Sequence, residues 1–234
     1  EQFDLNDFDL VISVSHSFGK GIITKPETKH ICYCLTPTRY LWHEAGLPFK
    51  PISRFILAYL RNWDYQAAQR PDYFTACSEN VRQRIKKYYG RGSEVIYPPN
   101  QAKTASESAH RTFPSDSTLT NKYFLIVGRL VPYKRFDIAI EAFSKLPEEK
   151  LLVIGDGPEF KKLKAKSQKL KVDNIKFLGQ VSDGELFEYY AGSKALIFPQ
   201  EEDFGIVPVE AMAAGRPVIA YRAGGAAETI KEGE

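Results

Sequence analysis

The stretch ALIFPQEEDFGIVPVEAMAAGRPVIAY, residues 195–221, decides the fold class. Its pattern predicts a strand over 195–198, a loop rich in carboxylates, a helix over about 208–214 and a strand over 218–221. Pro208 suits the first helical turn, because its missing N–H would have no intrahelical partner there. Strand, helix and strand joined by short loops form the crossover unit of a parallel sheet. The sequence therefore predicts an α/β protein.

The same alternation extends over residues 122–234. Further strands are predicted over 123–127, 151–154 and 175–178, with helices over about 135–145, 159–169 and 183–191, and Gly224-Gly225 opens a last helix. Five strands separated by helices are typical of a doubly wound, Rossmann-like sheet. Residues 122–234 are predicted to form one such domain, incomplete at its end.

Residues 1–98 are predicted to be part of a second Rossmann-like domain. Strands are expected over about 9–15, 30–35, 73–77 and 94–97, and helices over about 51–69 and 79–89, the second capped by Ser78. The first strand is expected to be buried. Residues 99–121 are rich in Ser, Thr, Ala and Pro, which predicts a linker or mobile loop. We expect a chain truncated at both ends.

Composition excludes several classes of protein. The 32 basic and 29 acidic residues are too balanced for a dedicated nucleic-acid binder. No apolar run is long enough to span a membrane and no signal peptide is visible. Three cysteines, at 32, 34 and 77, predict buried thiols in a reducing compartment, so the protein is expected to be cytoplasmic.

Motifs of other enzyme classes are incomplete. Gly155-Asp-Gly-Pro-Glu-Phe160 has the first two glycines of a dinucleotide-binding loop but Phe at the third. Asp7-Phe-Asp9 precedes its strand instead of following it, which is not how a metal-binding Asp-x-Asp is placed. Neither a zinc cluster nor a Gly-x-Ser-x-Gly elbow is present. We expect no cofactor and no catalytic metal.

The loop after 195–198 predicts an anion site. The amides of Gly205, Ile206 and Val207 lie at a helix N-terminus, and ligands of open α/β sheets bind outside the carboxyl ends of strands. Glu202 and Glu210 lie on either side, where they could accept hydrogen bonds from the hydroxyls of a sugar nucleotide. The alternative is an acidic cap favoured by the helix dipole, and spacing alone does not decide between them.

A basic loop follows the strand over 123–127. Arg129 and Lys134 in this loop could meet the same anion and stabilise a diphosphate leaving group as its charge develops. The alternative is a loop whose cations merely stay solvated.

Together these motifs resemble the retaining, nucleotide-sugar-dependent glycosyltransferases of the GT-B fold, the group 1 (family four) type, and in particular its mannosyltransferases. The resemblance covers nearly all of the chain from Tyr123 onward. It rests on Gly128-Arg129 to Lys134, Gly155-Asp-Gly-Pro158, Phe177-Leu-Gly179, Glu202 to Gly215 and Gly224-Gly225.

The resemblance implies a role for each matching residue. Arg129 and Lys134 would hold the donor diphosphate, Glu202 the transferred sugar and Glu210 the ribose. The implied catalytic residues are His16, Arg129, Lys134 and Glu202, and the implied donor-binding residues are Gly128, Gly155, Gly157, Val181, Phe204, Gly205, Ile206, Val207 and Glu210.

The first block resembles the acceptor side of the same family. His16 follows a strand where the family places a His beside the transferred sugar, and residues 32–42 resemble its acceptor-side stretch. Leu35 stands where relatives often carry His. The family's opening Gly-rich loop is not found in this sequence, so donor binding without turnover is one expectation.

These features predict transfer of a hexose, mannose from GDP-mannose, to a glycan or lipid-linked acceptor with retention. The alternatives are a sugar-nucleotide binding module without transfer activity and a sugar-nucleotide epimerase on the same fold. The basic, aromatic segment over 54–70 could rest on the inner face of an anionic membrane, which makes peripheral association a hypothesis. The interpretation that we favour for this segment is a surface helix with an apolar inner face.

Overall fold

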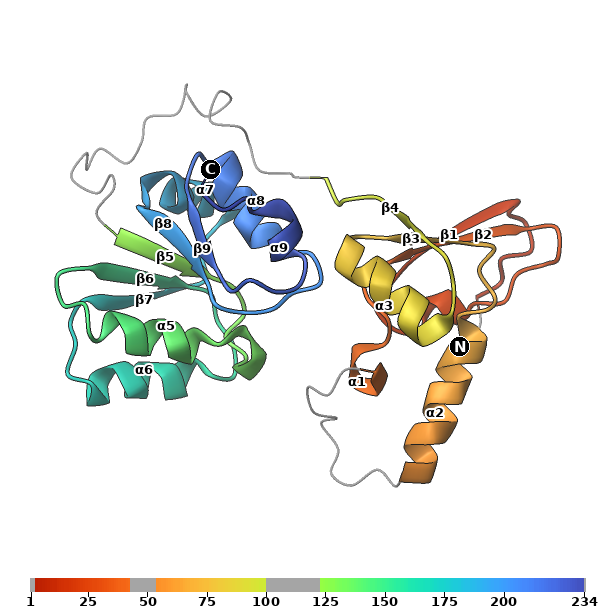
Figure 1. Ribbon diagram of the computed structural model, residues 1–234, viewed down its shortest axis with the longest axis horizontal. Coiled ribbons are helices and arrows are strands. Elements are labelled where there is room, and N and C mark those ends of the chain that lie inside the picture. The colour runs from red at the N-terminus through yellow and green to blue at the C-terminus, as the bar shows by residue number, and fades with distance from the viewer. Residues whose placement is uncertain (1–2, 43–53, 100–122, 234) are drawn as a thin grey trace. The chain divides into compact units, whose positions relative to one another are not determined.

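The computed structural model describes residues 3–42, 54–99 and 123–233. The chain divides into two compact units, Glu1–Pro98 and Pro99–Glu234. Each unit is built around its own parallel sheet (Figure 1). The linker or mobile loop predicted over 99–121 lies outside the described residues, apart from Pro99.

Among its described residues, the first unit contains four parallel strands in the order β1-β2-β3-β4. The strands are β1 (Leu10–Ser15), β2 (Lys29–Cys34), β3 (Tyr73–Ala76) and β4 (Glu94–Val95), and the helices are the 3-10 turn η1 (Gly19–Gly21), α1 (Arg39–Trp42), α2 (Arg54–Ala67) and α3 (Glu79–Tyr89). The predicted N-cap of α3 is confirmed, because Ser78 Oγ accepts a hydrogen bond from the Val81 amide at 3.0 Å. The three cysteines are buried thiols.

Two strands of this unit differ from the expectation. The predicted burial of β1 is wrong for one face: Leu10, Ile12 and Val14 are exposed, because the described residues cover only the other face of this strand. The strand expected over 94–97 is shortened to β4. Tyr97 precedes two prolines, which have no N–H to continue a ladder.

Helix α2 is fully buried only in its carboxyl-terminal half, where Asp64 binds Lys20 of η1 and Thr38. Asp64 and Ala67 are buried, whereas Phe55, Ile56 and Tyr59 are exposed. The inner face expected for this helix is half-buried in its first two turns, at Leu57 and Leu60, and fully buried further on. Residues 51–53 of the predicted helix lie outside the described residues.

The second unit is the predicted five-stranded, doubly wound sheet, with strand order β7-β6-β5-β8-β9 and all pairs parallel. Helices α5 and α6 cover one face, and α7 and α8 cover the other (Figure 1). The elements are β5 (Tyr123–Val127), the 3-10 turn η3 (Pro132–Lys134), α5 (Phe136–Phe143), β6 (Lys150–Ile154), α6 (Phe160–Lys169), β7 (Ile175–Gly179), α7 (Asp183–Gly192), β8 (Ala195–Phe198), α8 (Ile206–Ala213), β9 (Val218–Ala220) and α9 (Ala226–Thr229).

Strand β5 shows how the sheet forms its two cores. Tyr123, Leu125 and Val127 pack with α7 and α8, while Phe124 and Ile126 pack with α5 and α6. Alternate side chains of a strand point to opposite faces, so an unbroken apolar run is what a doubly covered strand requires. In the parts of the chain that the structure describes, no helix is long and apolar enough to cross a membrane.

Candidate functional site

The topology of the second unit creates one favoured place for a ligand. From β5 the chain moves outward through β6 to β7, and it then returns to pair β8 with the opposite side of β5. At such a switch point the loops that follow the two central strands diverge at their carboxyl ends. The loops after β5 and β8 carry six of the predicted site residues.

Lys134 and Glu202 form an ion pair at the carboxyl ends of β5 and β8. Lys134 ends the turn η3 after β5, and Glu202 lies in the loop after β8; their Nζ and Oε1 atoms are 2.8 Å apart. The side chains are only 13% and 19% exposed, so the surrounding protein screens the pair less than bulk water would. Gln200, which is buried, donates its amide to Glu202 Oε1 at 3.4 Å.

Glycines allow the β5 and β6 loops to approach each other closely. A Cβ on Gly155 would lie 2.0 Å from the Gly128 carbonyl oxygen, and a Cβ on Gly157 would lie 2.5 Å from the Leu130 carbonyl oxygen. A Cβ on Gly128 would lie 3.0 Å from Lys134 Nζ. These three glycines therefore shape the backbone that positions Lys134.

A second pair of glycines supports the Glu202 loop from the β9 side. The Gly225 amide donates to the Glu202 carbonyl oxygen at 2.9 Å. A Cβ on Gly224 would lie 2.2 Å from that oxygen, and one on Gly225 would lie 2.4 Å from the Cα of Phe204. The position of Glu202 thus depends on backbone contact with Gly224-Gly225.

Helix α8 begins at Ile206, two residues before the predicted start. Gly205 precedes it at φ 91°, and Pro208 is the third residue of the helix. A proline is tolerated there because the first four N–H groups of a helix have no intrahelical acceptor. The amides of Ile206 and Val207 consequently lie at the positive end of the helix dipole.

Glu210 is held by a tyrosine that sequence analysis missed. The Tyr190 hydroxyl donates to Glu210 Oε2 at 2.9 Å, and Tyr190 is buried in α7. Burial raises the pKa of Glu210, and the charge of Asp183 raises it further. Burial and the Glu210 carboxylate raise the pKa of Tyr190, so it stays protonated as a donor. This bond occupies one of the two carboxylate oxygens.

The remaining predicted residues are placed less centrally. Arg129 follows Gly128 with an exposed side chain, and Val181 is half-buried next to the α7 core. Phe204 is buried between Glu202 and α8. His16 belongs to the first unit, where it follows β1 and is exposed.

The carboxyl ends of the strands in the second sheet bring together groups that recognise phosphate and groups that recognise hydroxyls. Lys134 and the α8 amides can bind an anion, while Glu202 and Glu210 can accept hydrogen bonds. Within 3–42, 54–99 and 123–233, no three His, Cys, Asp or Glu side chains are grouped so as to hold a metal ion.

Comparison with known proteins finds one family repeatedly. The model of "Glycosyl transferases group 1" matches residues 110–234, more than half of the chain. An uncharacterized glycosyltransferase of Methanocaldococcus jannaschii is 37% identical over 110 residues, 47% of this chain and 31% of that protein. The GDP-mannose-dependent alpha-(1-6)-phosphatidylinositol monomannoside mannosyltransferase of Mycobacterium tuberculosis is 27% identical over 210 residues, 81% of this chain and 52% of that protein.

Solved structures show the same fold. Anabaena Alr3699/HepE in complex with UDP-glucose superposes with a TM-score of 0.69 at 24% identity, covering 88% of this chain and 56% of that one. The GT-B-type fold expected from the sequence is thereby confirmed. The chain spans 31% and 52% of the length of the two curated relatives above.

Proposed function

The chain belongs to the group 1 family of glycosyl transferases, and from this premise we propose that the protein transfers a hexose from a nucleotide sugar to a glycan or lipid-linked acceptor. The Lys134–Glu202 pair at the switch point is the observation that carries the proposal. It puts a phosphate-binding cation and a hydroxyl-binding carboxylate 2.8 Å apart, next to the amides that open α8.

The proposed reaction proceeds with retention and without a catalytic metal. The bond between the sugar C1 and the diphosphate oxygen breaks, the acceptor oxygen bonds to C1 on the same face, and the acceptor proton passes to the departing phosphate oxygen. Lys134, Arg129 and the α8 amides stabilise the negative charge that accumulates on the diphosphate. Glu202 orients the transferred sugar, and the family resemblance implies a part for His16 in the same step.

We propose GDP-mannose as the donor. The support is the mycobacterial GDP-mannose-dependent relative, which aligns over 81% of this chain. UDP-glucose, the ligand of the Anabaena protein, is the competing donor. Val181, Gly155 and Gly157 would lie near the base, and Glu210 would accept the ribose hydroxyls.

Release of nucleoside diphosphate from GDP-mannose and UDP-glucose by the complete natural protein tests this proposal. We expect acceptor-dependent release of GDP, unchanged by EDTA, and a product with the anomeric configuration of the donor by proton NMR. Tight donor binding with no transfer would instead indicate a binding module, and a new sugar nucleotide formed without acceptor would indicate an epimerase.

The raised pKa of Glu210 predicts how nucleotide affinity depends on pH. Protonation removes the charged acceptor, and a raised pKa moves that loss to a pH above the ordinary value of about 4.5. We expect affinity for the nucleoside diphosphate to fall on acidification, with a midpoint above that value. Glu210→Gln should bind more weakly at neutral pH and lose this dependence. The same acid-induced loss in both proteins, measured by calorimetry, would assign it to another group.

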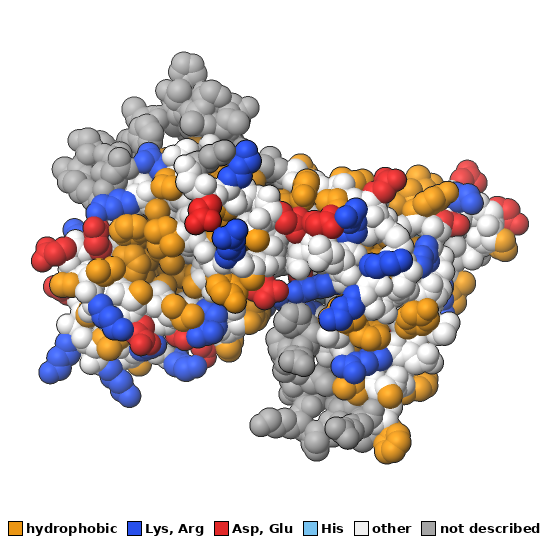
Figure 2. Space-filling view, in the orientation of Figure 1, with side chains coloured by type: hydrophobic (Ala, Val, Ile, Leu, Met, Phe, Trp, Pro, Cys, Tyr) orange, Lys and Arg blue, Asp and Glu red, His pale blue; other side chains and the backbone are white. Residues whose placement is uncertain are grey.

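Peripheral membrane association is a further part of the proposal. Phe55 is 86% exposed on α2, and Figure 2 shows hydrophobic side chains along this helix, at the lower right, with basic side chains beside them. Amphipathic helices with this composition bind anionic interfaces through charge and apolar area together. We expect Phe55→Ser/Tyr59→Ser to weaken sedimentation with anionic vesicles at low salt. Equal sedimentation of the variant and the native protein would reject α2 as the contact.

A further inference from the structure

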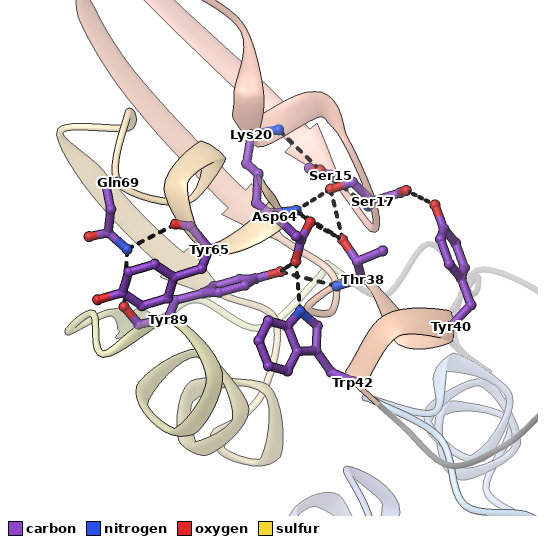
Figure 3. Close-up of polar contacts among 10 residues, drawn as sticks. All are labelled: Ser15, Ser17, Lys20, Thr38, Tyr40, Trp42, Asp64, Tyr65, Gln69 and Tyr89. Atoms are coloured by element: carbon purple, nitrogen blue, oxygen red, sulfur yellow. Dashed lines mark hydrogen bonds and ion pairs between the residues drawn. The ribbon is translucent and has the colours of Figure 1, made fainter. Parts of the chain in front are cut away.

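A buried ion pair lies at the centre of the first unit. Lys20 Nζ is 2.6 Å from Asp64 Oδ1, and the two side chains are 2% and 0% exposed. Three further donors surround the carboxylate (Figure 3). Thr38 Oγ1 binds Oδ1 at 2.7 Å, while Trp42 Nε1 and the Tyr89 hydroxyl bind Oδ2 at 2.7 and 2.9 Å.

These side chains come from segments that are far apart in the sequence. Lys20 lies in η1 after β1, and Thr38 precedes α1, the helix that ends at Trp42. Asp64 lies in α2, and Tyr89 is the last residue of α3. The carboxylate therefore joins the loops that follow β1 and β2 to the two long helices of the unit. Burial and the Asp64 charge raise the pKa of Tyr89, which keeps it a donor.

Stability alone does not account for this arrangement. Removing two charges from water is costly, and apolar replacements of buried ion pairs often leave stability unchanged or increase it. Each bond to the Asp64 carboxylate is directional, however, and together they fix the distances between the loops. The network is better suited to setting geometry than to adding stability.

The geometry that it sets is that of the loop carrying His16. The Ser15 hydroxyl accepts from the amides of Ser17 and Lys20, both at 3.3 Å. The Ser17 carbonyl accepts from Lys20 Nζ, and Thr38 Oγ1, which donates its proton to Asp64, lies 3.3 Å from the same oxygen. His16 is exposed between these two anchored serines, so its backbone is fixed on both sides.

The second loop is attached to the first. The Tyr40 hydroxyl is hydrogen bonded to the Ser17 hydroxyl, and the Thr38 amide donates to the Tyr89 hydroxyl at 3.1 Å. The segment from Thr36 to Tyr40 follows β2, the strand that pairs with β1. Both loops thus emerge at the same edge of the sheet and share one buried anchor.

We propose that Lys20, Thr38 and Asp64 are positioning residues, which hold the His16 loop and the loop after β2 in the arrangement that sugar transfer requires. This inference rests on the proposed function. Misplacement of a reacting group by about 1 Å can lower a rate about 100-fold. Loosening the anchor should therefore lower turnover without weakening the donor site, whose proposed residues apart from His16 all lie in the second unit.

Thr38→Val in the complete natural protein is the primary test, because it removes one hydroxyl and retains the ion pair. We expect kcat to fall by about tenfold or more, with the KM for donor within about twofold of the native value. Hydrogen exchange of the amides of residues 16–20 should become faster. Unchanged kcat and unchanged exchange would overturn the inference. So would parallel losses of kcat, donor affinity and melting temperature, which indicate a merely structural role.

The double variant Lys20→Met/Asp64→Leu provides an independent test. If it melts near the native temperature, we expect low kcat with intact nucleotide affinity, and native turnover would overturn the inference. If it does not fold, Thr38→Val decides alone. Lys29→Met is the matched control. Lys29 pairs with Asp72 at 3.8 Å and lies at the start of β2, at the other end of the strands, so its replacement should leave kcat unchanged.

Transfer assays of the native protein distinguish failure of this inference from failure of the proposed function. If it transfers no sugar from any nucleotide donor, the proposed function is wrong. Exchange of the 16–20 amides still tests whether the anchor holds the loop. If the native protein is active and Thr38→Val is equally active, only the positioning inference is wrong.

Discussion

Replacement of Lys134 by methionine is expected to lower the rate of sugar transfer about 100- to 1,000-fold, the usual effect of removing one donor to a developing negative charge. Lys134 Nζ lies in a mostly buried position at the switch point, 2.8 Å from Glu202. Affinity for the nucleoside diphosphate should also fall, because the same cation meets phosphate in the ground state. Steady-state kinetics with varied donor, together with calorimetry, would measure both effects.

Two variants make this result specific. Lys150→Met removes an exposed lysine at the start of β6, at the other end of the strands from Lys134. It should change neither the rate of transfer nor the affinity for the nucleoside diphosphate. Glu202→Gln should lower the rate while leaving diphosphate affinity unchanged or higher, since the carboxylate no longer competes for Lys134. Equal loss of rate in Lys134→Met and Lys150→Met would contradict the assigned role.

Gly224→Ala is expected to reduce both stability and transfer, whereas Gly215→Ala should reduce stability alone, and by less. Both glycines have left-handed backbones, with φ of 63° and 73°. A side chain there costs about 1–2 kcal/mol at either position. Only at Gly224 would the new Cβ meet backbone, 2.2 Å from the Glu202 carbonyl oxygen, because no atom lies within 4 Å of a Cβ on Gly215.

The difference between Gly224→Ala and Gly215→Ala measures the effect of the contact between Gly224 and the Glu202 loop. We expect Gly224→Ala to lose about 1–3 kcal/mol more of the free energy of unfolding than Gly215→Ala, the usual cost of overpacking. Its kcat should fall as Glu202 is displaced. Urea unfolding and transfer kinetics measure the two effects, and similar values for both variants would show that Gly224 does not support the site.

The second sheet was predictable because its strands are apolar on both faces. Tyr123 to Val127 and Ala195 to Phe198 are continuous apolar runs, which only doubly covered strands require. The exposure of one face of β1 could not be predicted in the same way. Its apolar side chains would suit an interior strand, but the neighbours present in the fold cover only the face with Ser13 and Ser15.

The residues proposed for the site have sequence motifs of their own, but their pairings do not. Lys134 and Glu202 were both expected to bind donor, yet only the adjacency of β5 and β8 brings them together. The bond between Tyr190 and Glu210 spans 20 residues, and that between Lys20 and Asp64 spans 44. Local periodicity carries no information about such contacts, so Tyr190, Lys20 and Asp64 gave no signal of their own.

Calorimetric titration of the complete natural protein with GDP, GDP-mannose, UDP and UDP-glucose tests the central claim most directly, with Lys134→Met and Lys150→Met titrated alongside. The account predicts saturable binding of one nucleotide family, GDP and GDP-mannose, to the native protein and to Lys150→Met. It predicts at least about tenfold weaker binding to Lys134→Met, a loss of the size expected for a charged hydrogen bond. Binding of equal strength by both variants, or no binding by the native protein, would contradict a donor site at this edge of the sheet.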